Sequence, residues 1–275
     1  MSQPPPKDEL LIRINLLAAR WVVLFWLAGW YLKAGFYFPY LVQTTRHYPV
    51  AHPLFPEFFS SPYVATVFYF LPLLVVPILS FCGRGFVWVA AVLMALSAAV
   101  LNLHINTCND ATFVTSFWVA LWLCWFTSQA GRASADVRRH ARFLAQCLVG
   151  VIFLGGTVGK LTPEYWDGEV MGRIFIVQTD QSPAGKILRH LSPELQKTAA
   201  TWISRSVIGG EALLALSPFF PYRLVAVLGS AVFVVISIFS TWRIFSVLAC
   251  LMGMLLACLL LEKSNNAGSQ PEDQI

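Results

Sequence analysis

The stretch FLGGTVGKLTPEYWDGEVM, from Phe153 to Met171, passes from an apolar, glycine-rich segment into a polar, aromatic one. Lys160 lies at the change, where a membrane helix is expected to end. A lysine at the mouth of such a helix, followed by Trp166 and Gly168, is costly in lipid unless its charge is paired or hydrated. The stretch therefore predicts a membrane helix that ends just before Lys160 and an outer segment that begins with it.

The composition of the whole chain agrees with a membrane protein. Of 275 residues, 57% are hydrophobic and 12% are charged, whereas roughly a quarter of a soluble domain is charged. The aromatic share of 14% suits the belts that aromatic residues form at the two membrane surfaces. The net charge of +5 is small and dispersed, which favours a positive-inside bias over nucleic-acid binding. The lipid bilayer is thus the expected partner, and no nucleic acid is expected.

Membrane-spanning helices need about 20 mostly apolar residues, and the chain contains a series of such segments. They lack the apolar–polar alternation of barrel strands, so an all-α polytopic bundle is expected. We count about eight spans, or seven if one of the two short segments, the fourth and the sixth, does not cross. The expected spans are Ile14–Phe36, Tyr63–Phe81, Phe86–Leu103, Phe113–Phe126, Phe143–Gly159, Trp202–Leu216, Arg223–Trp242 and Ile244–Leu261.

These spans divide the rest of the chain. Residues 1–13 form the N-terminal segment, 160–201 an outer loop within the transmembrane domain 14–261, and 262–275 a polar, disordered tail. The loop Gly131–Arg142 holds four arginines against one aspartate and is expected to be cytoplasmic. Counting spans from it places both termini inside and the 160–201 loop outside. We expect no cleavable signal peptide, and a multi-pass protein of the cytoplasmic (inner) membrane if the source is bacterial. An endoplasmic reticulum membrane fits the same charge pattern.

Two short amphipathic segments are expected on the membrane face within the outer loop. One is GRIFIVQ after Met171, and the other is SPELQKTAATWIS from Ser192. Ser192 followed by Pro193 predicts a helix start, with serine as the cap and proline in the first turn.

Ionisable groups inside or beside the spans are the candidate functional residues. A partly desolvated lysine has a lowered pKa and can act as a general base, which makes Lys160 the leading candidate. Polar groups gather toward the same leaflet and are its expected partners. The candidate catalytic residues are Lys160, Asp110, His104 and Glu211, and the candidate ligand-binding residues are Trp166 and Arg243.

Each candidate also has a purely structural interpretation. Lys160 can snorkel at the interface, His104 can be a hydrogen-bonded packing residue, and Asp110 can cap a helix. Glu211 can pair with Arg205 or Arg243, and Arg243 can simply mark a tight turn between two spans. Gly155 and Gly159 form a small-residue pair that lets another helix approach closely.

The motifs of several enzyme classes are missing from the sequence. There is no HExxH, Walker loop, GxSxG or dinucleotide fingerprint. Five of the six cysteines fall in or beside apolar runs without metal-ligand spacing, which favours buried apolar roles. No metal site is expected.

The stretch around Lys160 resembles the membrane motif of the HTTM superfamily, whose best-known members are the vitamin K-dependent gamma-carboxylases. That motif has an aromatic residue, small residues, Lys-Leu, a tryptophan and a glycine. NTCNDATF, from Asn106, and the closing RIFSVLACLMGMLLACLLL resemble further parts of the family more loosely. In the carboxylases the matching lysine is implicated in chemistry on reduced vitamin K, so the resemblance implies that Lys160 is a catalytic or quinone-facing residue. The residues that fit the motif are Phe153, Gly155, Gly159, Lys160, Leu161, Trp166 and Gly168.

Three departures from the carboxylase pattern limit what the resemblance implies about function. Asp110 stands where the family has a histidine, and apolar residues near Val235 and Ile236 stand where the family has a second histidine. The large lumenal domain of the carboxylases is also missing after the bundle. We therefore do not expect glutamate carboxylation. Smaller relatives serve as accessory proteins in toxin-peptide maturation. The Gly-Lys-Leu element also resembles DoxX-like and MauE-like four-span proteins, which implies a redox-partner role.

Two hypotheses of function follow. In the first, an outward-facing membrane site centred on Lys160 binds a quinone-like or lipid-like ligand, with a quinone or isoprenoid as the cofactor class. In the second, the chain is a non-catalytic accessory or maturation subunit for a peptide or redox protein, and Lys160 only anchors its helix. Whether the chain is an enzyme stays open.

Overall fold

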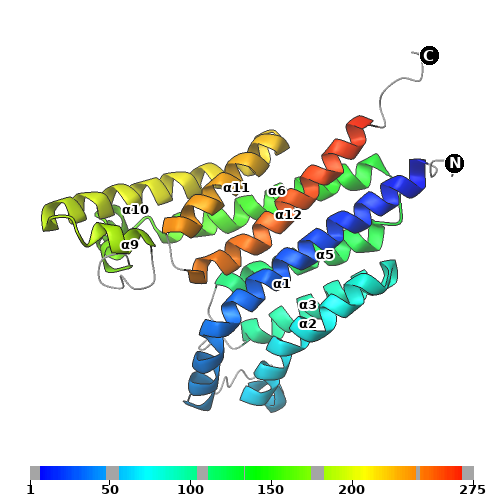
Figure 1. Cartoon of the computed structure of the whole chain (residues 1–275), viewed down its shortest axis with the longest axis horizontal. Coiled ribbons are helices and arrows are strands. Elements are labelled where there is room, and N and C mark those ends of the chain that lie inside the picture. The colour runs from blue at the N-terminus through cyan, green and yellow to red at the C-terminus, as the bar shows by residue number, and fades with distance from the viewer. Residues whose placement is uncertain are drawn as a thin grey trace. The chain divides into compact units, whose positions relative to one another are not determined.

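The computed structural model describes residues 7–47, 56–103, 111–132, 134–174, 183–239 and 242–267, and every regular element in them is helical, as predicted (Figure 1). The elements, in chain order, are α1 (Lys7–His47), η1 (Glu57–Ser60), α2 (Pro62–Cys82), α3 (Arg84–Leu103), α5 (Ala111–Gln129), α6 (Ala135–Gly159), α7 (Pro163–Trp166), α8 (Glu169–Gly172), α9 (Pro183–Leu188), α10 (Pro193–Ala215), η4 (Ser217–Phe219), α11 (Tyr222–Phe239) and α12 (Trp242–Ala267).

Five helical stretches in the described residues are long and apolar enough to cross a membrane. They correspond to the first five predicted spans. Two shorter apolar stretches, Tyr222–Ile236 and Ser246–Glu262, lie where the last two spans are predicted. The total of eight spans and the direction of the termini stay predictions. The five long stretches are Asp8–Lys33, Tyr63–Cys82, Arg84–Leu103, Ala111–Gln129 and Ala135–Gly159.

The sixth predicted span is part of a longer helix. α10 begins at Pro193 and continues to Ala215, so the amphipathic segment predicted from Ser192 and the span predicted from Trp202 are one helix. The outer loop accordingly ends at Ser192 and not at residue 201. The predicted helix start is confirmed, because the Ser192 hydroxyl accepts a hydrogen bond from the backbone N–H of Leu195 and proline occupies the first turn.

The predicted disordered tail also begins too early. α12 extends to Ala267, so residues 262–267 are helical, and residues 268–275 lie outside the described part of the chain. Polar residues continue the apolar helix here because an α-helix satisfies its backbone hydrogen bonds internally, whichever side chains it carries.

The chain divides into two compact units, where the sequence predicts one transmembrane domain. The first comprises Met1–Arg142 with Ala249–Ile275, and the second comprises Phe143–Leu248. Within the first unit, α3 packs against α2 and α5, and α1 packs against α2 and α5. Within the second, α7 and α8 pack against α10.

Aromatic side chains form the core of the first unit. The Trp26 and Trp30 rings stack at 4.2 Å, Trp30 stacks on Tyr69 at 5.3 Å, and Phe113 meets Trp30 edge-on at 5.6 Å. Two of their polar atoms find backbone acceptors, whereas Trp30 Nε1 is buried without a hydrogen-bond partner among the described residues. Trp26 Nε1 donates to the Ser116 carbonyl at 3.1 Å, and the Tyr69 hydroxyl donates to the Trp30 carbonyl at 2.7 Å. Tryptophan and tyrosine can be buried here because these hydrogen bonds offset the loss of water.

In the second unit, α6 is fixed to the turn that follows α10. The Gln146 side chain donates to the carbonyls of Ser217 and Phe220 at 3.1 and 2.8 Å, and the Ser217 hydroxyl donates back to the Gln146 carbonyl at 2.7 Å. Further along α6, Phe153 stacks on Phe233 of α11 at 5.6 Å. These contacts set the position of α6 relative to α10, and with it the position of Lys160.

The close approach of α1 and α12 in the first unit generates a prediction. A Cβ atom at Gly253 would lie 2.4 Å from Phe25 Cβ, which no side-chain rotation relieves because both atoms are attached to the backbone. Gly253→Ala should therefore lower the free energy of unfolding by roughly 1–3 kcal/mol, seen as a lower Tm of the detergent-purified protein.

Gly210→Ala is the matched control, since that helical glycine has open space around its Cβ position. This variant should gain up to about 1 kcal/mol from helix propensity. Equal Tm changes in the two variants would contradict the packing described for Gly253.

Candidate functional site

Lys160 and Glu211 form an ion pair within the second unit. Lys160 Nζ lies 2.8 Å from Glu211 Oε2, and the two side chains are 21% and 11% exposed. Lys160 Nζ also donates to the Gly156 carbonyl at 3.3 Å. Lys160 follows the last turn of α6 and Glu211 lies near the end of α10, so the pair joins the ends of these two helices. Of the polar partners predicted for Lys160, Glu211 is thus brought into direct contact with it.

A glycine at position 156 makes room for this pair. A Cβ there would meet Glu211 Oε2 at 3.0 Å and Lys160 Nζ at 3.5 Å. The sequence predicts a close helix approach at the pair Gly155 and Gly159, with Gly156 beside them, and the structure shows the contact at Gly156. At Gly155 and Gly159 a Cβ would have no described neighbour within 4 Å. Gly156 faces the pair because it lies four residues before Lys160, on the same side of the helix.

Polar side chains of α10 hold the segment that follows Lys160. Residues 165–167 each offer a backbone carbonyl, and three residues on one side of α10 donate to them. The donors precede Glu211 by two to three helical turns, so the helix that carries the carboxylate also positions this segment. Thr201 Oγ1 donates to Asp167 at 2.9 Å, Ser204 Oγ donates to Tyr165, and Arg205 Nε donates to Trp166 at 3.3 Å.

Gly168 allows this segment to lie directly on α10. Its φ of +81° is in the left-handed region that favours glycine. A Cβ at this position would also lie 2.5 Å from the backbone nitrogen of Thr201. Both the backbone conformation and the contact exclude larger residues, which gives the glycine at position 168 a structural reason.

Tyr165 lies beside the ion pair. Lys160 Nζ is 5.9 Å from the centre of its ring, within the range of a cation–π contact. Burial, with the negative charge of Glu211 as a second cause, raises the pKa of Tyr165. The pKa of the exposed Glu164 is lowered by hydrogen bonds from the backbone N–H of Glu164 and from the Thr162 side chain. The segment thus presents a neutral phenol towards the pair.

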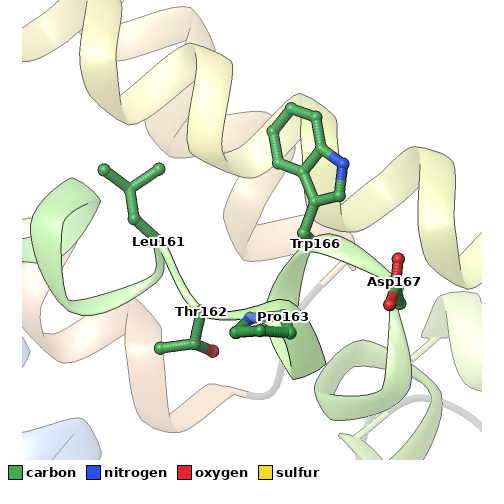
Figure 2. Close-up of a pocket in the computed structure, with 5 residues that line it drawn as sticks. All are labelled: Leu161, Thr162, Pro163, Trp166 and Asp167. Carbon is green, nitrogen blue, oxygen red and sulfur yellow. The ribbon is translucent and has the colours of Figure 1, made fainter.

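A pocket with a volume of 420 Å³ lies along this segment (Figure 2). Figure 2 shows the Leu161 and Trp166 side chains on one side of the chain and Thr162 on the other. Lys160 and Glu211 do not line the pocket, although Leu161 directly follows Lys160. Its lining residues are Leu161, Thr162, Pro163, Trp166 and Asp167.

Trp166 is half exposed and carries Arg205 on its ring. Arg205 Cζ lies 5.0 Å from the ring centre, so Arg205 supports Trp166. The sequence indicated Arg205 or Arg243 as possible ion-pair partners of Glu211, whereas in the structure Glu211 pairs with Lys160. Arg243 belongs to α12, but its side chain is not among those described.

The remaining predicted residues are not brought to this site by the structure. His104 and Asp110 lie outside the described residues. Within the described part of the chain, no group of three or more His, Cys, Asp or Glu residues could hold a metal ion. Sequence reasoning missed Tyr165, and it named Gly156 only as a neighbour of the Gly155 and Gly159 pair. Tyr165 could have been found from the aromatic pair next to the lysine, whereas Gly156 differs from its neighbouring glycines only by the side of the helix it occupies.

Comparison with known proteins finds no match among protein-family models, curated proteins or solved structures.

Adjacent glycines offer a test of the site's geometry. Gly155→Ala should gain up to about 1 kcal/mol from helix propensity, since its Cβ has free space. Gly156→Ala places its Cβ against Glu211 and should be less stable than Gly155→Ala by roughly 1–2 kcal/mol. Thermal unfolding of the two purified variants measures the difference. If Gly156→Ala were as stable as Gly155→Ala, the close contact with Glu211 would be wrong.

The raised pKa of Tyr165 predicts a dependence on alkaline pH. The folded protein holds this phenolic proton more tightly than the unfolded chain does. The resulting stability is fully present below about pH 10 and is lost as the pH rises through the folded pKa. Tyr165→Phe removes this titration, so its stability should fall less than that of the wild type above about pH 10.

Tyr63→Phe, at an exposed tyrosine, is the control. Unfolding measured as a function of pH should separate Tyr165→Phe from both the control and the wild type. Parallel curves for all three proteins would argue against a buried phenol beside Glu211.

Proposed function

We propose that this chain is an integral membrane protein of HTTM type that binds a quinone-like or lipid-like ligand beside the Lys160–Glu211 pair. The observation that carries the proposal is the 2.8 Å ion pair between two largely covered side chains. A charge pair placed among apolar helices loses hydration on both partners and is costly without good geometry. A function in ligand binding is one reason to keep such a pair in the chain.

The pair can supply two kinds of chemistry. In its ionised form Lys160 is a hydrogen-bond donor and a positive charge, suited to a quinone carbonyl or a headgroup oxygen. Proton transfer to Glu211 Oε2, 2.8 Å away, would convert it to a neutral amine that can accept a proton from a ligand hydroxyl. Glu211 would then hold the proton, and the net charge of the pair would not change.

The neighbouring pocket suits a ring or an isoprenoid chain. Leu161, Pro163 and Trp166 give it apolar walls, and Thr162 and Asp167 add polar groups. Its 420 Å³ volume falls within the range of about 300–1,000 Å³ for small-molecule sites. Trp166, with one ring face contacted by Arg205, is a fixed surface on which a planar ligand could stack.

One observation favours the second hypothesis, an accessory or maturation subunit. Lys160 and Glu211 bind each other and do not line the pocket, as expected if the pair only anchors α6 to α10. In that case the chain would serve a peptide or redox protein without chemistry at Lys160.

Mass spectrometry of small molecules retained by the detergent-purified protein tests the proposal. The wild type should retain a quinone or isoprenoid. Lys160→Met and Glu211→Gln should each reduce the retained amount roughly tenfold or more, equivalent to at least about 1.4 kcal/mol. Lys197→Met, at an exposed lysine of the same helix α10, should retain as much as the wild type.

Stability of the double variant separates binding from folding. Either single change leaves one charge of the pair without its partner and should cost roughly 2–4 kcal/mol. Lys160→Met/Glu211→Gln removes both charges and should recover much of that loss. If the double variant is stable and still retains the ligand, the pair is an anchor. If the wild type holds only bulk lipid, the ligand-site proposal fails.

A further inference from the structure

Two arginines near the start of α6 carry guanidinium groups that the protein does not satisfy. Arg138 is 3% exposed, and its Nε and Nη1 atoms are buried without a hydrogen-bond partner. Arg142 follows one helical turn later, and its buried Nε also lacks a partner. The two residues are four positions apart and share one side of the helix. Three buried donors on two cationic groups thus have no hydrogen-bond partner in the described part of the chain.

The carboxylates of the described chain do not balance this charge. Glu262 of α12 lies beside Arg142, with Nη1 and Oε1 3.9 Å apart and both side chains 19% exposed. Asp136, in the first turn of α6, is exposed, and no ion pair joins it to Arg138. Among the described residues, one carboxylate therefore lies beside Arg142, and none forms an ion pair with Arg138.

An unpaired buried guanidinium is unfavourable, because arginine stays charged and cannot shed its proton to reduce the cost. Natural proteins satisfy such groups with a partner of opposite charge. Here that partner needs several acceptor oxygens and at least one negative charge. A phosphate group has both and is the ligand for which arginine geometry is best suited.

We infer that Arg138 and Arg142 form a binding site for a phosphate group at the N-terminal end of α6. The phosphate oxygens accept from the free nitrogens of Arg138 and Arg142, while Glu262 keeps its contact with Arg142. The surrounding sequence favours an anion, since Arg132 and Arg139 are exposed in the same short stretch. The site belongs to the first unit and does not depend on the function proposed for Lys160.

The phosphate can come from a lipid headgroup or from solution. α6 is one of the helices long and apolar enough to cross a membrane, and Arg138 lies in its first turns, at the depth where headgroups occur. Free phosphate offers the same oxygens without an acyl chain. Separate arms of one experiment distinguish these sources.

Thermal unfolding of the full chain provides the test. The wild type is compared with Arg138→Met, which retains an apolar stem, and with Arg139→Met as the exposed neighbouring control. In detergent without phospholipid, inorganic phosphate is added against sodium chloride of equal ionic strength. In the second arm, the same detergent without phospholipid is compared with detergent containing phosphatidylglycerol.

Saturating probe should raise the Tm of the wild type and of Arg139→Met by roughly 5–10 °C, and should leave Arg138→Met unchanged. A rise with inorganic phosphate identifies free phosphate as sufficient, and a rise only with phosphatidylglycerol identifies a lipid headgroup. In detergent without any probe, Arg138→Met should be at least as stable as the wild type, because it removes an unpaired buried charge.

Three results would overturn the inference. One is a wild-type Tm that neither probe changes, and another is an equal response of Arg138→Met and Arg139→Met. The third is a marked loss of stability in Arg138→Met without any probe, since that would mean that the guanidinium already has a partner within the protein.

Discussion

A charge that leaves water must find a partner, and the arrangement of α6, α10 and the segment between them follows from that requirement. Lys160 ends an apolar helix, and Glu211 lies in an otherwise apolar part of another. Each is costly alone, and together they form an ion pair at 2.8 Å. Glycine at position 156 favours the approach. Two α10 hydroxyls bind the carbonyls of Tyr165 and Asp167 in the segment between the helices.

The same requirement explains the core of the first unit. Trp26 and Tyr69 are fully buried, and each directs its polar atom to a backbone carbonyl of another helix. In the second unit, Gln146 and Ser217 exchange hydrogen bonds with backbone carbonyls in a similar way. Helix–helix contacts in this protein thus combine apolar packing with a few directed polar contacts. Some buried polar atoms of the first unit lack a hydrogen-bond partner within the described part of the chain, among them Trp30 Nε1 and Ser97 Oγ. Arg138 differs from these neutral groups because its unsatisfied guanidinium carries a charge, and this charge is what indicates an external ligand.

The site around Lys160 joins two features with different chemistry. The ion pair can hold or move a proton, and the pocket beside Trp166 offers apolar walls and an aromatic surface. They are linked by Leu161, which follows the lysine and lines the pocket. A ligand with a polar head and a long apolar body could contact both, as a quinone or an isoprenoid would.

The sequence by itself determined that the chain is helical, where five membrane-length helices lie, and where a further helix begins at Ser192. These properties depend on local composition and on capping, which act over a few residues. It also selected Lys160 and Glu211 as costly residues, because an ionisable group in an apolar run is visible without a structure. It could not decide that the two are partners. Residues 51 positions apart meet only through the packing of their helices.

Only the tertiary structure decided which glycine faces the ion pair and that α10 is one continuous helix. It also decided that Arg205 contacts the Trp166 ring and that Glu211 pairs with Lys160. Gly155, Gly156 and Gly159 are equivalent in composition. They differ in the direction in which each Cβ would point, and what lies in that direction is set by a helix distant in sequence. Which residue carries an unfavourable charge in an apolar segment can be read from the nearby sequence. Which group forms an ion pair with that charge depends on the fold.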